Sequence, residues 1–259
     1  MSTTRTRIAE LAREDRERRF TSIAHLLTPE ALYLAYEGLK KDASAGVDGV
    51  TCAEYEETLW ERLLDLHDRL KSGCYRAQPL RRVYIPKEDG KKKRAISIPS
   101  LEDKIVQRAT VELLNAIYEQ DFLGCSYGFR PRRSAQDALD EVGRVICRRP
   151  ISYVLEADIA SYFDSIVRSQ LMELIQHRVV DGSILQLIGK WINVGVIEDG
   201  RLLVTETGTG QGQVISPLLA AYSGGLRTPI PIDGGQRFQT MVDGVSDAMV
   251  DTFSASLEW

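Results

Sequence analysis

Apolar residues recur every three or four positions in several stretches, which is the spacing of an amphipathic helix. One stretch follows Thr28-Pro29, a capping residue with proline at the first helical position. Another follows Thr51, which forms a capping-box pattern with Glu54 and predicts one helix through residue 70. The same spacing predicts helices at about 100–118, 169–179 and 183–194, and helices that start at Ser134 and Ser216. In the 100–118 helix, Gln107 falls on or near the polar face.

Two stretches predict β-hairpins. Residues 80–99 and residues 194–205 each contain two short β-prone runs separated by an Asp-Gly turn. A third β-branched run, 151–155, precedes Asp158 and predicts a buried strand that places this carboxylate at its carboxyl end. Helices and strands mixed in this way predict an α/β (α+β) fold.

Charge is distributed unevenly along the chain, and this distribution bears on whether the protein binds nucleic acid. The formal net charge of -4 argues weakly against a nucleic-acid partner, but residues 71–149 carry +7, whereas residues 1–70 carry -4 and residues 150–259 carry -7. Such a basic block beside an acidic segment suits an enzyme that handles phosphodiesters, because phosphates bind cations and Mg²⁺ binds carboxylates. A solvated charged face is the alternative. Residues 5–20 mix both charges with few apolar positions and predict an exposed, frayed helix.

The cysteines predict no metal or redox site, and the hydropathy pattern predicts no membrane segment. Cys52, Cys74, Cys125 and Cys147 lie too far apart for a zinc or redox pair, so we expect reduced thiols. No run of 18 apolar residues occurs and the first residues lack the apolar core of a signal peptide. We therefore expect a cytoplasmic protein with no membrane partner.

Five segments, in one order along the chain, resemble the motifs of a known family. They are Ala45-Gly-Val-Asp-Gly-Val-Thr51, the 80–99 hairpin, Phe129-Arg-Pro-Arg-Arg-Ser-Ala-Gln-Asp-Ala138, Asp158-Ile-Ala-Ser-Tyr-Phe-Asp164 and Gly208-Thr-Gly-Gln-Gly-Gln-Val-Ile-Ser-Pro217. Together they resemble reverse transcriptases of the group II intron type. The resemblance implies a right-hand polymerase fold with fingers and part of the palm. It also implies an RNA-directed DNA polymerase with an intron-splicing (maturase) role.

The tip of the first hairpin is rich in cations. Lys87, Lys91, Lys92, Lys93 and Arg94 there form an electrostatic clamp for phosphates. The resemblance implies that Lys87 and Arg94 hold the triphosphate of an incoming deoxynucleotide, with the other three lysines as open alternatives to Lys87. We also expect Lys91, Lys92 and Lys93 to bind nucleic-acid phosphates.

The resemblance assigns the remaining site residues to the palm. Asp158 would bridge two Mg²⁺ ions, and the Ile159 carbonyl would help to hold one of them, since these ions prefer hard oxygen ligands. Tyr162 would pack under the sugar and reject a 2′-hydroxyl, and Gln211 would contact the primer–template or the nucleotide. Asp164 is interpreted as a turn or cap residue.

An arginine-rich turn next to aromatic residues is a second candidate for nucleic-acid contacts. Arg130, Arg132 and Arg133 follow Tyr127 and Phe129, and arginines beside aromatics suit template or phosphate contacts. The alternative is a surface turn whose two aromatic side chains pack inward. The partners implied are an RNA template or intron RNA and a DNA primer.

The sequence differs from the family motif at two positions, and the resemblance does not extend over the whole chain. Gly210 stands where the family usually has proline, and Gln213 where it has glycine. Past about Ala221 the match is lost, and no adjacent pair of acidic residues follows to supply the second metal-binding carboxylate. The expected division is an N-terminal helical extension (1–41), fingers (42–150), a partial palm (151–221) and a divergent tail (222–259), disordered or out of frame.

Three functional readings follow from these observations. The first is an incomplete group II intron-type reverse transcriptase that does not polymerise as this chain. The second is a non-catalytic RNA-binding fragment, and the third is a host-defence reverse transcriptase of a related lineage. DNA synthesis and RNA affinity distinguish the first two.

Overall fold

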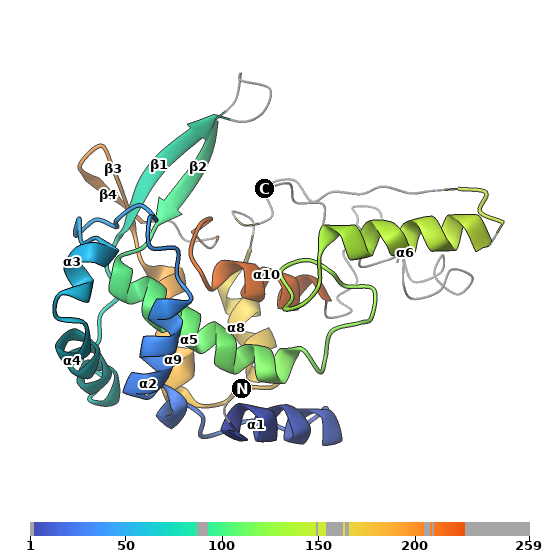
Figure 1. Ribbon diagram of the computed structural model, residues 1–259, viewed down its shortest axis with the longest axis horizontal. Helices are drawn as coiled ribbons and strands as arrows, with labels where there is room; N and C mark the ends of the chain where they lie inside the picture. The colour runs from blue at the N-terminus through green and yellow to red at the C-terminus, as the bar shows by residue number, and fades with distance from the viewer. Residues whose placement is uncertain are drawn as a thin grey trace.

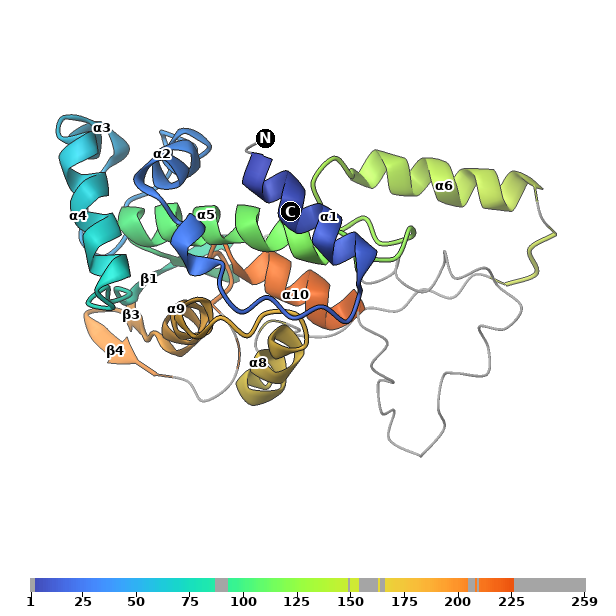
Figure 2. The same ribbon diagram turned by 90° about the horizontal axis from the view of Figure 1, so that it is seen from below.

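A long central helix, α5 (Leu101–Tyr118), organises the fold. The computed structural model describes residues 3–86, 93–148, 150–153, 163, 166–204, 208 and 210–225. A sheet lies near one end of α5, and α6 (Ala135–Arg148) extends beyond the other (Figure 1). Seen from below, α1 (Thr3–Glu14) and α2 (Pro29–Glu37) lie on one side of α5, whereas the other side holds α8 (Arg168–Gln176), α9 (Gly182–Asn193) and α10 (Ser216–Gly225) (Figure 2). The predicted mixed α/β class is confirmed.

Side-chain caps start several helices as the sequence predicts. The hydroxyls of Thr28, Thr51, Ser100 and Ser134 each accept a hydrogen bond from the backbone N–H three residues later. At Thr51 the capping box is complete, because the Glu54 carboxylate also accepts from the Thr51 N–H. Each such cap satisfies backbone donors that the first helical turn leaves unpaired.

The single helix predicted after Thr51 is wrong, because the structure has two. Helix α3 (Cys52–Glu56) ends before Thr58, whose φ of -129° and ψ of 34° are not helical, and α4 (Leu59–Lys71) follows. The Thr58 hydroxyl accepts a hydrogen bond from the Arg62 side chain. The change of direction lets Tyr55 pack 6.0 Å from the Tyr36 ring, measured between ring centroids, while α4 still buries its own leucines.

Both predicted hairpins form, and they join into one sheet of order β2-β1-β3-β4. Strands β1 (Leu80–Pro86) and β2 (Lys93–Ile98) pair antiparallel, as do β3 (Val196–Glu198) and β4 (Arg201–Leu203). Asp199 and Gly200 both have positive φ, which is the turn that matches the twist of a two-residue hairpin. The parallel pairing of β1 with β3 connects the two hairpins and was not predicted.

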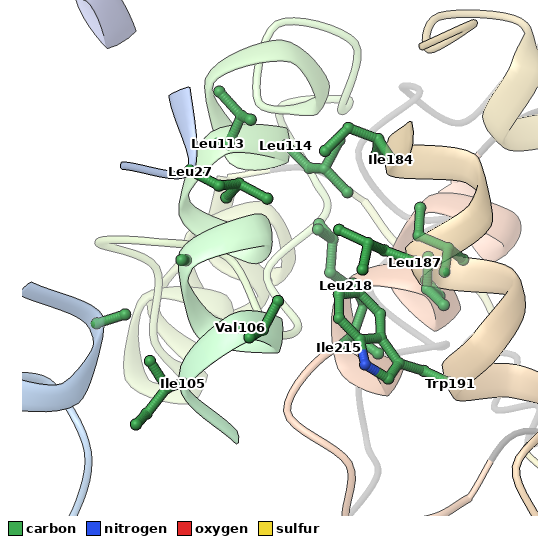
Figure 3. Packing of buried hydrophobic residues seen from close by; sticks show 14 of the residues in the cluster. Leu27, Ile105, Val106, Leu113, Leu114, Ile184, Leu187, Trp191, Ile215 and Leu218 are labelled. Atoms are coloured by element: carbon green, nitrogen blue, oxygen red, sulfur yellow. The ribbon is translucent and has the colours of Figure 1, made fainter. Parts of the chain in front are cut away.

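One cluster of buried apolar side chains surrounds α5. Figure 3 shows Val106 and Leu114 of α5 facing Leu187 and Trp191 of α9, with Leu218 of α10 between them. The cluster extends from α1 to α10 and crosses the predicted boundaries at residues 41 and 150. None of the helices in the described part of the chain combines the length and apolar character needed to cross a bilayer.

Two sequence expectations about this core need correction. Gln107 is fully buried and does not lie on a polar face, because its amide has hydrogen-bonding partners inside the protein. Tyr222, placed in the divergent tail by the sequence, is also buried: α10 continues to Gly225, and the Tyr222 ring stacks on Tyr118 at 3.8 Å between centroids. Residues 226–259 of that tail lie outside the described residues.

Helix α1 is packed on the protein and is not the exposed helix that its charges suggested. Ile8 and Ala12 are buried against the core around α5. The Arg178 side chain, 4% exposed, lies 3.0 Å from the Asp121 carboxylate and donates to carbonyls at the end of α1 and in the segment after it, including that of Ala12 at 3.1 Å. The charged segment therefore docks through its backbone carbonyls, which charge patterning does not reveal.

Candidate functional site

The structure describes six of the predicted site residues. They are Lys93, Arg94, Arg130, Arg132, Arg133 and Gln211. The predicted residues Lys87, Lys91, Lys92, Asp158, Ile159 and Tyr162 lie outside the described residues, as does Asp164. Their roles stay predictions.

The β1–β2 hairpin positions its cations by the pairing of its strands. Lys93 pairs with Pro86, and Arg94 pairs with Ile85. Side chains alternate between the faces of a strand, so Lys93 and Arg94 point to opposite faces. Lys93 is exposed and Arg94 is half-buried. The hairpin therefore presents cations at the end that carries its predicted turn.

A glycine loop, defined here as Gly208 and residues 210–216, lies directly on β2. The backbone N–H of Ser97 donates to the Gln211 carbonyl at 2.7 Å. Gly212 has φ +107°, and a Cβ there would lie 2.8 Å from the Ser97 carbonyl oxygen, so a side chain at this position is excluded. Two motifs far apart in the sequence, one with Arg94 and one with Gln211, are thus brought together.

The start of the glycine loop is tied to the segment that follows the predicted acidic motif. The Gly208 N–H donates to the Ile166 carbonyl at 2.9 Å. Arg168 Nε donates to the Gly208 carbonyl, also at 2.9 Å, and burial lowers the pKa of this guanidinium without removing its charge at neutral pH. The glycine loop therefore connects β2 with residues that directly follow Asp158-Ile-Ala-Ser-Tyr-Phe-Asp164 in the sequence.

A buried network of amides supports the glycine loop, and sequence reasoning missed it. The Gln107 amide donates to the Gln213 side-chain oxygen at 3.0 Å, and the Gln213 amide donates to the Trp191 carbonyl at 3.2 Å. The Ile215 N–H donates back to the Gln107 oxygen at 3.3 Å. The signal in the sequence was Gln213 itself, a large polar residue where the resembled motif has glycine.

The three arginines of the turn at 130–133 differ in their contacts and in their exposure to solvent. The Arg130 side chain is 6% exposed, pairs with Glu119 at 3.1 Å and donates to two backbone carbonyls, so this conformation ties it to the protein. Arg133 lies over the Tyr127 ring, 4.9 Å from its centroid. Arg132 has φ +62° and an exposed side chain. Of these three predicted nucleic-acid contacts, Arg132 is the most exposed in this conformation, and the prediction itself stays untested.

The inward-packing alternative for this turn holds in part. Tyr127 is buried at 9% exposure and Phe129, with φ +56°, is half-buried. Packing of the aromatics and exposure of Arg132 are compatible, because the positive φ at Phe129 and Arg132 turns the chain sharply between them.

The structure does not test the predicted metal site directly. Among the described residues, no three His, Cys, Asp or Glu side chains gather closely enough to hold a metal ion. The predicted donors, a carboxylate from Asp158 and the carbonyl of Ile159, are hard oxygen ligands of the kind that Mg²⁺ prefers.

Comparison with known proteins gives a family match. The family model described as "Reverse transcriptase (RNA-dependent DNA polymerase)" matches residues 85–223. Group II intron-encoded protein LtrA of Lactococcus lactis subsp. cremoris is 35% identical over 215 residues, which cover 83% of this chain and 36% of that protein. Protein YkfC of Escherichia coli (strain K12) is 42% identical over 178 residues, covering 68% and 46%.

Two further similarities extend this comparison. An uncharacterized 91 kDa protein in the cob intron of Schizosaccharomyces pombe is 34% identical over 199 residues, covering 75% of this chain and 24% of that protein. A chain in a partial Cas6-RT-Cas1–Cas2 complex aligns with a TM-score of 0.48 and 24% identity, covering 76% and 32%. The chain spans less than half of the length of each of these proteins.

Proposed function

We propose a function from the family to which this chain belongs, the reverse transcriptase (RNA-dependent DNA polymerase) family. The chain supplies the fingers and part of the palm of an RNA-directed DNA polymerase of the group II intron type. The observation that carries the proposal is the hydrogen bond between Ser97 and Gln211. It puts the strand of Arg94 beside the glycine loop. The resemblance assigns Arg94 to the incoming nucleotide, and Gln211 in the loop to the nucleotide or the primer–template.

The proposed roles follow the chemistry of the side chains. Arg94 and Lys87 hold the triphosphate, the arginine as a planar fork and the lysine as a point charge. Gln211 faces the nucleotide or the primer–template, and Tyr162 packs under the sugar. The fingers at residues 42–150 and the partial palm at 151–221 remain the proposed division, and the cytoplasm the proposed location.

Enzymes of this family generally use divalent metal ions, and we propose Mg²⁺ for this chain. When bound, the ions lower the charge on the attacking 3′ oxygen and on the leaving pyrophosphate. Asp158 and the Ile159 carbonyl are the proposed donors. Residues 222–259 contain no adjacent acidic pair that could add a second carboxylate.

The proposed partners are intron RNA or an RNA template, a DNA primer and deoxynucleoside triphosphates. RNA binding is supported by the net charge of +7 on residues 71–149 and by the exposed side chains of Lys93 and Arg132. A maturase role would use the same cations to bind the intron. A non-catalytic RNA-binding fragment is the second candidate, favoured by the missing acidic pair.

We expect the 259-residue chain to bind structured RNA with a marked dependence on salt concentration. Replacing Lys91, Lys92 and Lys93 by alanine should flatten the plot of log affinity against log salt by up to about 2 to 3 units, since each phosphate contact contributes roughly 0.7 to 0.9. Filter binding or fluorescence anisotropy across a salt series measures the slope.

A charge-matched variant separates this clamp from net charge. Arg7, Arg16 and Lys40 are exposed and lie outside residues 71–149, and replacing all three by alanine should change the slope by less than about one unit, because no phosphate contact is assigned to them. Equal flattening in the two variants would show that net charge alone drives binding. An affinity that does not change with salt would remove the proposed RNA role.

A further inference from the structure

The side-chain amide of Gln213 is hydrogen-bonded inside the protein through both its nitrogen and its oxygen. The residue is 3% exposed, its amide nitrogen donates to the Trp191 carbonyl, and its oxygen accepts from Gln107. A buried amide is costly to leave unpaired, so these bonds hold the side chain in one orientation. The Gln107 oxygen also accepts from the Ile215 N–H, two residues further along the glycine loop. The network therefore fixes the base of the glycine loop to α5 and α9.

Gly210 fits the same space only because it has no side chain. A Cβ at this position would lie 2.8 Å from the amide nitrogen of Gln213 and 2.6 Å from Cδ1 of Leu80. Both distances are below the separation of non-bonded heavy atoms in packed interiors. The Gln213 amide cannot swing away without breaking its bonds to Trp191 and Gln107. A proline at position 210 is thus incompatible with the observed Gln213.

The two positions also meet through the backbone. The Gln213 N–H donates to the Gly210 carbonyl at 3.2 Å, and the Ser216 hydroxyl donates to the same carbonyl at 3.1 Å. Gln211 lies in the turn that these bonds close, and its carbonyl accepts from Ser97 of β2. An amide anchored at 213 therefore sets where Gln211 lies against the strand that carries Arg94.

We infer that Gln213 is a positioning residue for Gln211. Relative to the resembled motif, glycine replaces proline at position 210 and glutamine replaces glycine at position 213, and these two replacements are coupled, because the anchored amide of Gln213 takes over the role of the proline. The link to nucleotide binding rests on the proposed function. The placement of the loop on β2 does not, so the two can be tested separately.

Amide hydrogen exchange of the intact chain, followed by NMR, tests the placement. The Ser97 N–H reports the bond to the loop, and the N–H of Leu114 in the middle of α5 reports the core. In Gln213→Gly, the protection of Ser97 relative to Leu114 should fall roughly tenfold, because a hydrogen-bonded anchor is lost. Gly210→Pro alone should lower the same ratio. The double variant G210P/Q213G should return it to within about threefold of the original chain, because the clash with the Gln213 amide is gone and the fixed φ of proline replaces the restraint that the anchor supplied. The remaining contact is with Leu80 Cδ1, the end of a flexible side chain that can turn away.

Two further variants keep the test decisive. Leu66→Ala weakens the core far from the loop and should not lower Ser97 protection more than that of Leu114. If Gln213→Gly does not fold, Gln107→Met replaces it: the Gln213 amide then loses one partner, and the ratio should fall in the same direction by a smaller factor. Equal losses at Ser97 and Leu114, or a double variant no better than the worse single variant, overturn the inference.

Affinity for dATP with Mg²⁺ is the second readout. If the original chain binds dATP, Gln213→Gly should weaken binding and G210P/Q213G should restore it. Binding that stays equal in all three overturns the positioning of Gln211 toward a nucleotide. If no variant binds dATP, the proposed nucleotide site fails, while the exchange ratios still decide whether Gln213 places the loop.

Discussion

The purified 259-residue chain should show no DNA synthesis on a primed RNA template with Mg²⁺ and deoxynucleoside triphosphates. Nucleotide polymerisation uses two metal ions about 3.5 to 4 Å apart, which stabilise the attacking and leaving oxygens. This chain supplies Asp158 as its one assigned metal-binding carboxylate, with the Ile159 carbonyl beside it, and residues 222–259 add no adjacent acidic pair. One carboxylate and one carbonyl are too few ligands to hold two such ions.

Extension of a labelled primer on a gel measures this, with an active reverse transcriptase as the positive control for template and buffer. Two variants make a surprising result interpretable: Asp158→Ala removes the assigned ligand, and Asp164→Ala removes a nearby carboxylate interpreted as a turn or cap residue. Robust extension that is lost in Asp158→Ala and kept in Asp164→Ala would falsify the expected inactivity and identify Asp158 as a catalytic ligand.

The parts of this fold that the sequence predicts are those decided by short-range chemistry. A capping hydroxyl and its backbone donor lie three residues apart, so the caps at Thr51 and Ser100 can be read directly. The Asp199-Gly200 turn likewise fixes its hairpin locally. Such interactions need no knowledge of which distant elements pack together.

The long-range arrangement could not be predicted in the same way. Helical spacing says which residues share a face, but not what faces them, so Gln107 was assigned to solvent although Gln213 and Ile215 satisfy its amide inside the protein. For the same reason the sequence did not predict the parallel pairing of β1 with β3 or the contact of the glycine loop with β2. The resemblance to a family identified the motifs of the site, whereas the structure shows how two of them touch.

The docking of α1 leads to the second prediction with a large effect, on stability. Arg178 is buried with Asp121 as its ion-pair partner, and its other donors hold the carbonyls of Ala12, Asp15 and Arg18 at 3.1, 3.1 and 3.2 Å. Replacing it with methionine keeps most of the apolar volume but leaves a carboxylate without its cation and several carbonyls without their hydrogen-bond donor. Removing one partner of a buried ion pair costs about 3 to 5 kcal/mol, a large share of the roughly 5 to 15 kcal/mol by which domains are stable.

The loss in Arg178→Met should depend on pH, because the Asp121 side chain, 12% exposed, then loses its ion-pair partner. Burial already raises the pKa of Asp121 above its ordinary value, and the Arg178 guanidinium opposes that rise. In the variant the pKa of Asp121 in the folded state rises further, so the folded chain binds a proton more readily than the unfolded chain and loses stability as pH increases through that raised value.

Urea unfolding at pH 5 and pH 7 should therefore show the larger loss at pH 7. Arg7→Met, which breaks an exposed pair with Glu10, is the matched control and should cost less than about 1 kcal/mol at either pH. A loss of that small size in Arg178→Met, or one that grows toward pH 5, would refute the role assigned to this ion pair.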